Sequence, residues 1–393
     1  MYVKSIDIEN IAGITKLDLT FNPQMNIICG ENGIGKTTII ECVAHTFSAS
    51  NTNILKRSVL SESGKFTSLI NVDSQDISKT ISINDFIPIS NTQIRGEYQK
   101  SKYLMSLKVT RTFNYMDLKA VSKDIDKPEH VIYQEAKLGV NIHEIKNWFV
   151  NRFLYSAHTG SLTDEQLENL ELAKSCFSII DDKFSFNRVM ASDNEIMINT
   201  PNGEIYYEYL SSGFKSIISI LFGIIKDIEF RFKEPTMEAK DFDGIILIDE
   251  LELHLHPIWQ AKISNILKEV FPKVQFIVTT HSPHIIQNAN PDEIIALKRD
   301  ENGVVIKKEI PNNEFGFQGW TVEEVLVDIM GMEDTRTEIY KNSIKDFQNA
   351  ITDENYSFAK EELDKLDKLL HPDNYLRKLL SFDLASVKGS EVD

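Results

Sequence analysis

Hydrophobic and polar residues alternate in some parts of the chain and form short apolar runs in others. The segment 14–21 alternates with a period of two, which predicts a strand with one buried face. The segments 25–29, 245–248 and 274–278 are mostly apolar, as expected of strands buried on both faces of a parallel sheet. Residues 49–94 mix polar and β-branched residues and predict further strands with loops. Together these patterns predict an α/β fold.

Apolar residues spaced three and four apart predict amphipathic helices in two other regions. The first region is 125–190, where the spacing is carried by Ile142, Ile145, Phe149 and Phe153. The second is the C-terminal tail, where it is carried by Ile344, Phe347, Ile351, Leu363, Leu366, Leu370, Leu376, Leu379 and Leu380. Gly331 and Pro372 mark breaks between the tail helices.

The segment GENGIGKTT has the spacing of a phosphate-binding loop, G-x-x-x-x-G-K-[ST], between a predicted strand and a predicted helix. Its small residues let backbone N–H groups approach phosphate oxygens, and the start of the helix adds a positive dipole end. We expect Lys36 to reach the β- and γ-phosphates and Thr37 to ligate Mg²⁺. The expected ATP-binding residues are Gly30, Glu31, Asn32, Gly33, Ile34, Gly35, Lys36, Thr37 and Thr38.

Two later strands end in polar side chains that suit the same chemistry. The run 245–248 ends at Asp249 and Glu250, which places both carboxylates at the ligand edge of a parallel sheet. Asp249 is expected to hold Mg²⁺ through water, and Glu250 to accept a proton from the attacking water. His281 follows the run 274–278 and is expected to hydrogen-bond a γ-phosphate.

The four histidines near these strand ends also raise the alternative of a transition-metal site; they are His254, His256, His281 and His284. Zinc sites usually add cysteine or carboxylate ligands at suitable spacing. We therefore favour a role for these histidines in shaping the turns after the strands.

The motifs GENGIGKTT, LSSG, IILIDE and TTHS occur in the order found in ABC-type ATPases, and the chain resembles the branch with SMC, RecF and OLD proteins. The resemblance implies an ATPase head with a mixed sheet flanked by helices. It also implies that Ser211, Ser212 and Gly213 contact ATP bound to another subunit. A head-to-tail homodimer, or a higher even-numbered oligomer, would follow.

Three features depart from the usual family pattern or leave it open. Ser212 replaces a frequent glycine, and Phe214 replaces a frequent Gln or Glu, which leaves the rate of hydrolysis open. The glutamine of the family's glutamine loop is either Gln93 or Gln134.

The resemblance also implies a division of the chain into domains. Residues 1–94 and 201–310 form two parts of the head, residues 95–200 form a helical insertion, and residues 311–393 form a helical docking region.

The tail either completes the fold or the dimer, or docks another protein. It resembles the tails of compact ATPases from Septu and retron-associated anti-phage systems, which work with a separate HNH nuclease. The resemblance implies an ATPase that regulates such a partner. After TTHS we find no convincing acidic cluster of a nuclease domain, so no nuclease activity of its own is expected.

Two other functions are compatible with parts of the sequence. Residues 95–119 mix basic and aromatic side chains that could grip DNA or RNA, as in a RecF-like DNA clamp. The net charge of −17 favours a solvated surface instead. A binding protein that keeps ATP as a structural ligand is the other alternative, and Glu250 argues against it because binding alone needs no base.

Composition bears mainly on where the protein works. No stretch of about 18 apolar residues exists, and the N-terminus lacks the apolar core of a secretory signal. The three cysteines form neither a disulfide framework nor a zinc pattern. We expect a cytoplasmic protein with no membrane partner.

Overall fold

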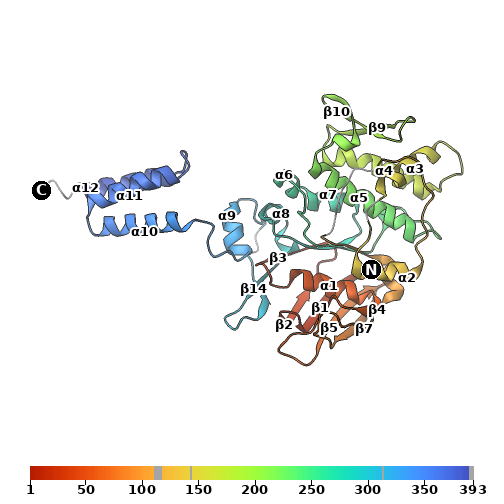
Figure 1. The fold of residues 1–393 in the computed structure, drawn as a ribbon, viewed down its shortest axis with the longest axis horizontal. Coiled ribbons are helices and arrows are strands. Elements are labelled where there is room, and N and C mark those ends of the chain that lie inside the picture. Colours follow the sequence, from red (N-terminus) through yellow and green to blue (C-terminus); the bar gives the residue numbers. More distant parts are fainter. Residues whose placement is uncertain (110–116, 142–143, 312–313, 389–393) are drawn as a thin grey trace. The chain divides into compact units, whose positions relative to one another are not determined.

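The structure, a computed structural model, describes residues 1–109, 117–141, 144–311 and 314–388, and the chain divides into two units (Figure 1). The first unit is Met1–Gly331 and the second is Met332–Asp393. The predicted boundary at residue 311 differs from this division because α9 (Val322–Glu324) and the π-helical turn Val325–Ile329 belong to the first unit. The side chains of Val325 and Ile329 are part of its hydrophobic core.

A six-stranded sheet in the order β15-β14-β3-β13-β12-β8 forms the centre of the first unit. All neighbouring pairs are parallel except β14 with β15. The strands are β3 (Met25–Gly30), β8 (Leu104–Leu107), β12 (Ile245–Ile248), β13 (Gln275–Thr279), β14 (Ile294–Arg299) and β15 (Val305–Lys307). Because β3, β13, β12 and β8 run the same way, the residues that follow them meet at one edge of the sheet.

Successive residues of these strands face two different hydrophobic cores. On β12, Ile246 and Ile248 join the core beneath the helices, whereas Ile245 and Leu247 join the core beneath the antiparallel strands. Side chains alternate across a strand, so a strand covered on both faces must be apolar at every position. This explains the unbroken apolar runs in the sequence.

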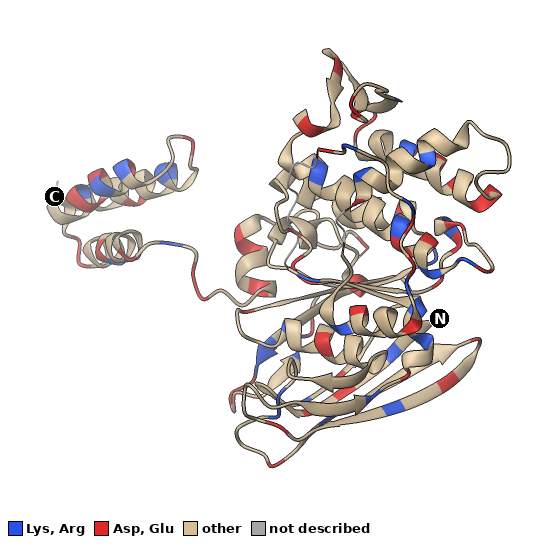
Figure 2. Cartoon of the chain, turned by 45° about the vertical axis from the view of Figure 1, so that its right-hand side comes forward, with Lys and Arg blue, Asp and Glu red and all other residues tan. Residues whose placement is uncertain are grey.

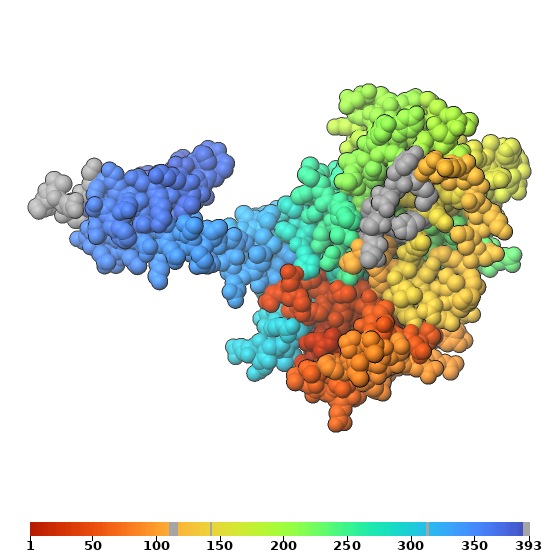
Figure 3. Space-filling view, in the orientation of Figure 1, coloured from red at the N-terminus to blue at the C-terminus, as the bar shows by residue number. Residues whose placement is uncertain are grey.

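One face of the central sheet is covered by α1 (Lys36–Thr46) and by a second, antiparallel sheet in the order β2-β1-β5-β6. Its strands are β1 (Tyr2–Ile11), β2 (Ile14–Thr20), β5 (Gly64–Val72) and β6 (Gln75–Ile83). A two-stranded sheet, β4 (Ala49–Thr52) with β7 (Thr92–Arg95), and helix α2 (Glu129–Leu138) complete this part. Figure 3 shows these N-terminal strands in red and orange.

The other face carries the helices α3 (Ile145–Ser156), α4 (Asp164–Ile180), α5 (Ser212–Arg231), α6 (Pro257–Gln260), α7 (Ile263–Val270) and α8 (Pro283–Gln287). A three-stranded sheet joins them, with β9 (Ser185–Val189), β10 (Ile196–Thr200) and β11 (Gly203–Tyr206). Short 3-10 helices span Tyr98–Tyr103, Tyr207–Tyr209, Ala239–Asp241 and Pro291–Glu293. Within the described ranges, no helix combines the length and the hydropathy needed to cross a membrane.

The helical stripe predicted within 125–190 packs as predicted where it is described. Phe149 on α3 is fully buried and stacks on Phe222 of α5, with ring centroids 5.1 Å apart. Ile145 and Phe153 pack against the same core. Ile142 lies outside the described residues.

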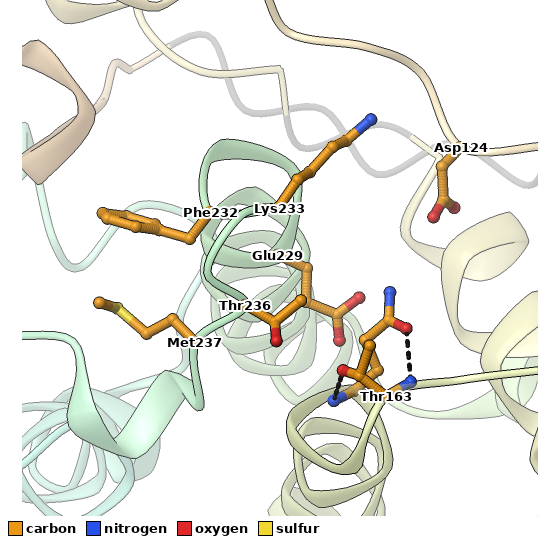
Figure 4. Close-up of a pocket in the computed structure, with 8 residues that line it drawn as sticks. Asp124, Thr163, Glu229, Phe232, Lys233, Thr236 and Met237 are labelled. Carbon is orange, nitrogen blue, oxygen red and sulfur yellow. Dashed lines mark hydrogen bonds between the residues drawn. The ribbon is translucent and has the colours of Figure 1, made fainter. Parts of the chain in front are cut away.

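Buried ionic contacts tie α3 to α5 inside this helical part. Arg152 Nε donates to Glu229 Oε2 at 2.8 Å, and Trp148 Nε1 donates to the same oxygen at 3.0 Å. The Arg152 guanidinium also holds Asp124. Glu229 and Asp124 line a cavity of about 250 Å³ together with Lys233 and Met237 (Figure 4). Burial raises the pKa of Glu229, and the Arg152 charge opposes that shift.

Replacing Arg152 should therefore destabilise the first unit strongly. We expect Arg152→Met to lower the free energy of unfolding by about 3–5 kcal/mol, because it leaves a buried carboxylate unpaired. The loss should shrink as the pH falls toward the raised pKa of Glu229, since a protonated carboxyl needs no counter-charge. Chemical denaturation at two pH values measures both effects.

The matched control is Arg188→Met, which removes an exposed ion pair with Glu204. That change should cost less than about 1 kcal/mol. Equal losses of unfolding free energy in the two variants would contradict a larger contribution of the buried Arg152–Glu229 pair.

The second unit is a small helical bundle with a core of its own. Its helices are α10 (Glu338–Thr352), α11 (Tyr356–Leu369) and α12 (Leu376–Lys388). The residues buried between them are Phe347, Ala350, Ala359, Leu363, Leu366, Leu370, Leu380 and Leu384. The helices predicted in the tail are thus present, and charges of both signs intersperse along them (Figure 2).

Candidate nucleotide-binding site

The loop between β3 and α1 has the backbone that a phosphate cradle needs. Gly33 and Gly35 have φ values of 73° and 111°, which side chains other than glycine rarely adopt. A Cβ atom on Gly30 would lie 2.5 Å from the carbonyl oxygen of Leu297 on the neighbouring strand. These three positions therefore favour glycine for the turn and for the packing of the loop on the sheet.

Lys36 begins α1 and folds back over this loop. Its Nζ donates to the carbonyl oxygens of Gly30 at 2.8 Å and Glu31 at 2.9 Å. Burial lowers the pKa of Lys36, and nearby carboxylates oppose that shift. The ammonium is thus held at the mouth of the loop.

Thr37 and Asp249 meet although they lie far apart in the sequence. The Thr37 hydroxyl is 3.2 and 3.3 Å from the two carboxylate oxygens of Asp249, which is itself buried. Thr279 Oγ1 donates to Asp249 Oδ1 at 2.6 Å and so orients the carboxylate from the next strand. A hydroxyl and a carboxylate are hard oxygen ligands of the kind that Mg²⁺ prefers.

Glu250 follows Asp249 in a left-handed backbone conformation, with φ at 51°. Its N–H donates to Thr279 Oγ1 at 2.8 Å, and the N–H of Leu251 donates to the Thr279 carbonyl at 2.9 Å. Such a conformation costs about 1–3 kcal/mol in a residue other than glycine and needs surrounding structure to hold it. The contacts with Thr279 supply that support and turn the chain sharply at Glu250.

His281 follows the end of the neighbouring strand β13 and interacts electrostatically with Lys36. Burial lowers the pKa of His281, and the Lys36 ammonium lowers it further. Both effects favour the neutral imidazole, whereas the carboxylates of Glu252, Glu250 and Asp249 oppose the shift. Glu252 fixes this loop, since it accepts hydrogen bonds from the His281 N–H at 2.6 Å and from Thr280 Oγ1 at 2.7 Å.

Of the other histidines, His256 has a structural contact. Its Nδ1 accepts from the N–H of Ile258 at 3.4 Å and caps the short helix α6. His254 has a left-handed backbone with φ at 65°, which is a turn conformation. His284 lies on α8. The positions of His254 and His256 fit the interpretation that these histidines shape turns, whereas His284 is a helix residue.

The segment Ser211–Gly213 forms the start of α5. Ser211 is its N-cap and accepts from the N–H of Phe214 at 3.3 Å, and both serines are exposed. A Cβ atom on Gly213 would lie 2.8 Å from Cδ1 of Trp259, so this position has no room for a side chain. The N-terminal N–H groups of a 20-residue helix begin here.

Phe214 is a core residue. It is 2% exposed and packs against the rings of Trp259 and Phe184, with centroid distances of 5.7 and 5.0 Å. Its side chain anchors the start of α5 on α6 and on the segment before β9. At this position a buried phenylalanine that packs in the core thus replaces the polar residue that is frequent in the family.

Neither candidate for the glutamine loop lies beside the carboxylates. Gln93 belongs to β7, where it pairs with Asn51, and Gln134 on α2 donates to Ser50 Oγ at 2.8 Å. The residue that follows β8 at the shared sheet edge is Lys108, whose Nζ donates to Glu41 Oε1 at 2.6 Å.

The sequence placed Lys108 only in the basic segment 95–119, and it gave no role to Glu41 or Glu252. Glu41 could have been found, because it lies four residues after Thr37 on the same helix face. Lys108 and Glu252 are placed by strand pairing and by a loop–loop contact, which no local pattern reveals.

Two lysines of the basic and aromatic segment at 95–119 have contacts within the chain. Lys102 Nζ lies over the rings of Tyr103 and Phe232, at 5.1 and 5.2 Å from their centroids. Lys108 is paired with Glu41. Residues 110–116, with Arg111, Phe113 and Tyr115, lie outside the described residues.

Comparisons with known proteins point to nucleotide-hydrolysing enzymes. A family model described as an AAA ATPase domain matches residues 156–286, and one described as an AAA domain matches residues 5–196. The Septu protein PtuA of Bacillus thuringiensis is 42% identical over 392 residues, which is 98% of each chain. The Retron Ec83 probable ATPase of Escherichia coli is 27% identical over 65% of this chain and 45% of its own length.

The solved structures to which this chain is similar include the SMC head domain from Thermotoga maritima. It has a TM-score of 0.47 at 14% identity, covering 79% of this chain and 100% of that chain.

Proposed function

Because the chain belongs to the PtuA family of ABC-type ATPases, we propose that it holds Mg-ATP between two head-to-tail subunits and regulates a separate HNH-type nuclease in anti-phage defence. ATP hydrolysis would control the partner, and this chain would cut no nucleic acid itself. This function needs a nucleotide site, a pairing of subunits and a surface on which the partner docks.

The meeting of Thr37 with Asp249, next to Lys36, is the observation that carries the site. These oxygens come from the first turn of α1 and the end of β12, and Thr279 holds the carboxylate in place. We assign Thr37 and Asp249 as the residues that would hold Mg²⁺, Asp249 through water. When bound there, Mg²⁺ would neutralise charge on the phosphates.

The remaining side chains supply binding and proton transfer. Lys36 would exchange its loop carbonyls for β- and γ-phosphate oxygens, while the loop N–H groups from Gly30 to Thr38 surround the phosphates. Glu250 would orient the attacking water and accept its proton. His281, whose pKa is lowered by burial, would hydrogen-bond the γ-phosphate.

The pairing of subunits is supported by the start of α5. Ser211 and Ser212 are exposed there, and the packing of Gly213 and Phe214 fixes the helix end. An exposed N-terminus of a long helix favours an anionic group in front of it. In the proposed dimer that group is the γ-phosphate held by the other subunit.

The docking of the nuclease is assigned to the second unit. Three apolar side chains, Tyr375, Leu379 and Phe382, are 68%, 43% and 72% exposed. Leu379 and Phe382 lie three residues apart on α12 and therefore share one face of that helix. An exposed apolar face on a separate helical bundle is typical of a partner-binding surface.

We expect Leu379→Asp combined with Phe382→Asp to abolish co-purification with an HNH protein encoded by an adjacent reading frame. A charge placed in the desolvated centre of an interface lowers the binding free energy far more than a charge placed at its solvated rim. Tagged full-length protein co-expressed with that product measures the association. ATP hydrolysis by the purified variant should stay at the wild-type rate, since the changes lie outside the first unit.

The control is Ser381→Asp, which adds one negative charge, half that of the double variant, at an exposed position of α12. This variant should retain the partner. Equal retention of the nuclease by the control and the double variant would argue against this docking face.

A further inference from the structure

A second carboxylate, Glu41, lies one helical turn behind the proposed Mg²⁺ ligand Thr37. Its side chain is 10% exposed. Oε1 accepts from Lys108 Nζ at 2.6 Å, whereas Oε2 is buried and has no hydrogen-bond partner among the described residues. Burial raises the pKa of Glu41, the Lys108 ammonium opposes this, and the Asp249 carboxylate raises it again. Glu41 thus shares an electrostatic environment with Asp249.

Lys108 is brought to this place by the pairing of β8 with β12. Leu107 is level with Ile248, and the N–H of Asp249 donates to the Leu107 carbonyl at 3.0 Å. The next residues along the two strands, Lys108 and Asp249, are therefore neighbours at the sheet edge. The Lys108 side chain is 15% exposed, so its charge is only partly screened by water.

The other basic group near Glu41 carries no charge. His45 Nδ1 lies 3.7 Å from Glu41 Oε2, but burial lowers the pKa of His45 to about 3. Its two ring nitrogens are bonded to the Glu41 carbonyl and to Thr52 Oγ1. The positive charge that faces Glu41 in the described structure thus comes from Lys108.

Charges of both signs meet around this sheet edge and the phosphate-binding loop. The carboxylates include Glu41, Asp249, Glu250 and Glu252, and the basic groups include Lys36, Lys108 and the exposed Arg299, whose Nη2 donates to the Gly33 carbonyl at 3.4 Å. A triphosphate is itself an anion and is repelled by uncompensated carboxylates. Buried ion pairs often add little to stability, because desolvation offsets the attraction. Stability alone therefore does not explain why the Lys108–Glu41 pair lies behind the phosphate-binding loop.

We propose that Lys108 and Glu41 form a charge pair that sets the nucleotide affinity of the site. In this pair Lys108 is a positioning residue that neutralises Glu41 and so favours the triphosphate. Glu41 opposes the triphosphate and limits how tightly it is held. The inference rests on the proposed ATP site, which it extends beyond the phosphate loop and the strand-end residues.

The test measures the Kd of a fluorescent ATP analogue in the presence of Mg²⁺. Lys108→Met should raise the Kd about tenfold, and Glu41→Gln should lower it about three- to tenfold, because each removes one charge at close range. The double variant should return to within about threefold of wild type. Lys108→Arg keeps the charge and should stay close to wild type.

A purely structural pair would behave differently. Loss of either partner would then lower the unfolding temperature and leave the Kd unchanged or weaker, never tighter. The control pair Lys146→Met and Glu195→Gln removes a buried lysine–glutamate contact of 2.7 Å in the helical part, and should change stability without changing the Kd. If Lys108→Met fails to fold, the tighter binding expected of the nearly isosteric Glu41→Gln still decides the question.

The binding data distinguish failure of the ATP site from failure of the charge pair. No binding of the analogue by the wild type would overturn the proposed ATP site itself. Binding by the wild type, with both single variants shifted in the same direction or not at all, would overturn only the charge pair.

Discussion

Glu250→Gln is expected to slow ATP hydrolysis by about 10²–10⁴-fold while ATP still binds. The amide keeps the shape of the side chain but cannot accept a proton from water. The contacts that hold this turn involve the N–H groups of Glu250 and Leu251 with Thr279, and the substitution leaves them intact. Hydrolysis is measured by phosphate release, and binding by the Kd of a fluorescent ATP analogue.

The same variant should also accumulate the closed dimer. If Glu250 acts after closure, blocking proton transfer leaves ATP between the subunits, so ATP should shift the variant from monomer to dimer in size-exclusion chromatography. Glu252→Gln is the comparison, because Glu252 holds the His281 loop through Thr280 without being the proposed base. A Glu250→Gln protein that hydrolyses ATP at the wild-type rate would rule out Glu250 as the base.

The parts of the site that could be predicted from the sequence are those whose chemistry is local. The strand, glycine-rich turn and helix from Met25 to Thr46 are contiguous, so one motif describes both the backbone and the side chains. The positions of Asp249 and Glu250 at the end of a buried strand could be predicted because an apolar run ends directly before them. The contact of Asp249 with Thr37 then follows from the parallel order of the strands.

The parts that could not be predicted depend on long-range pairing. Lys108 matters only because β8 pairs with β12, and a four-residue strand within a basic segment gives no sign of that neighbour. The inward direction of Phe214 depends on Trp259 and Phe184, which are distant in the sequence. The division at Met332 likewise depends on Val325 and Ile329, whose burial in the first unit cannot be read from their spacing.

The pairing of subunits has the sharpest test, because the proposed site is assembled from two chains. Ser212→Arg should leave the Kd for ATP within about threefold of wild type, since Ser212 is exposed and belongs to the half of the site facing another subunit. Hydrolysis and ATP-driven dimerisation should fall by at least about 10²-fold, because a long cationic side chain would occupy the space in front of α5. Ser178→Arg, at an exposed position of α4, is the matched control and should behave as wild type.

Mixing two inactive variants then separates contact between subunits from contact within one. Lys36→Ala should lose ATP binding, and Ser212→Arg should lose closure. In a head-to-tail pair of the two, one site combines the intact phosphate loop of the Ser212→Arg chain with the intact start of α5 of the Lys36→Ala chain. ATP should therefore drive the two differently tagged variants to associate with each other although neither associates with itself. If Ser212 served the nucleotide of its own chain, every site in the mixture would carry one of the two changes, and no association would appear.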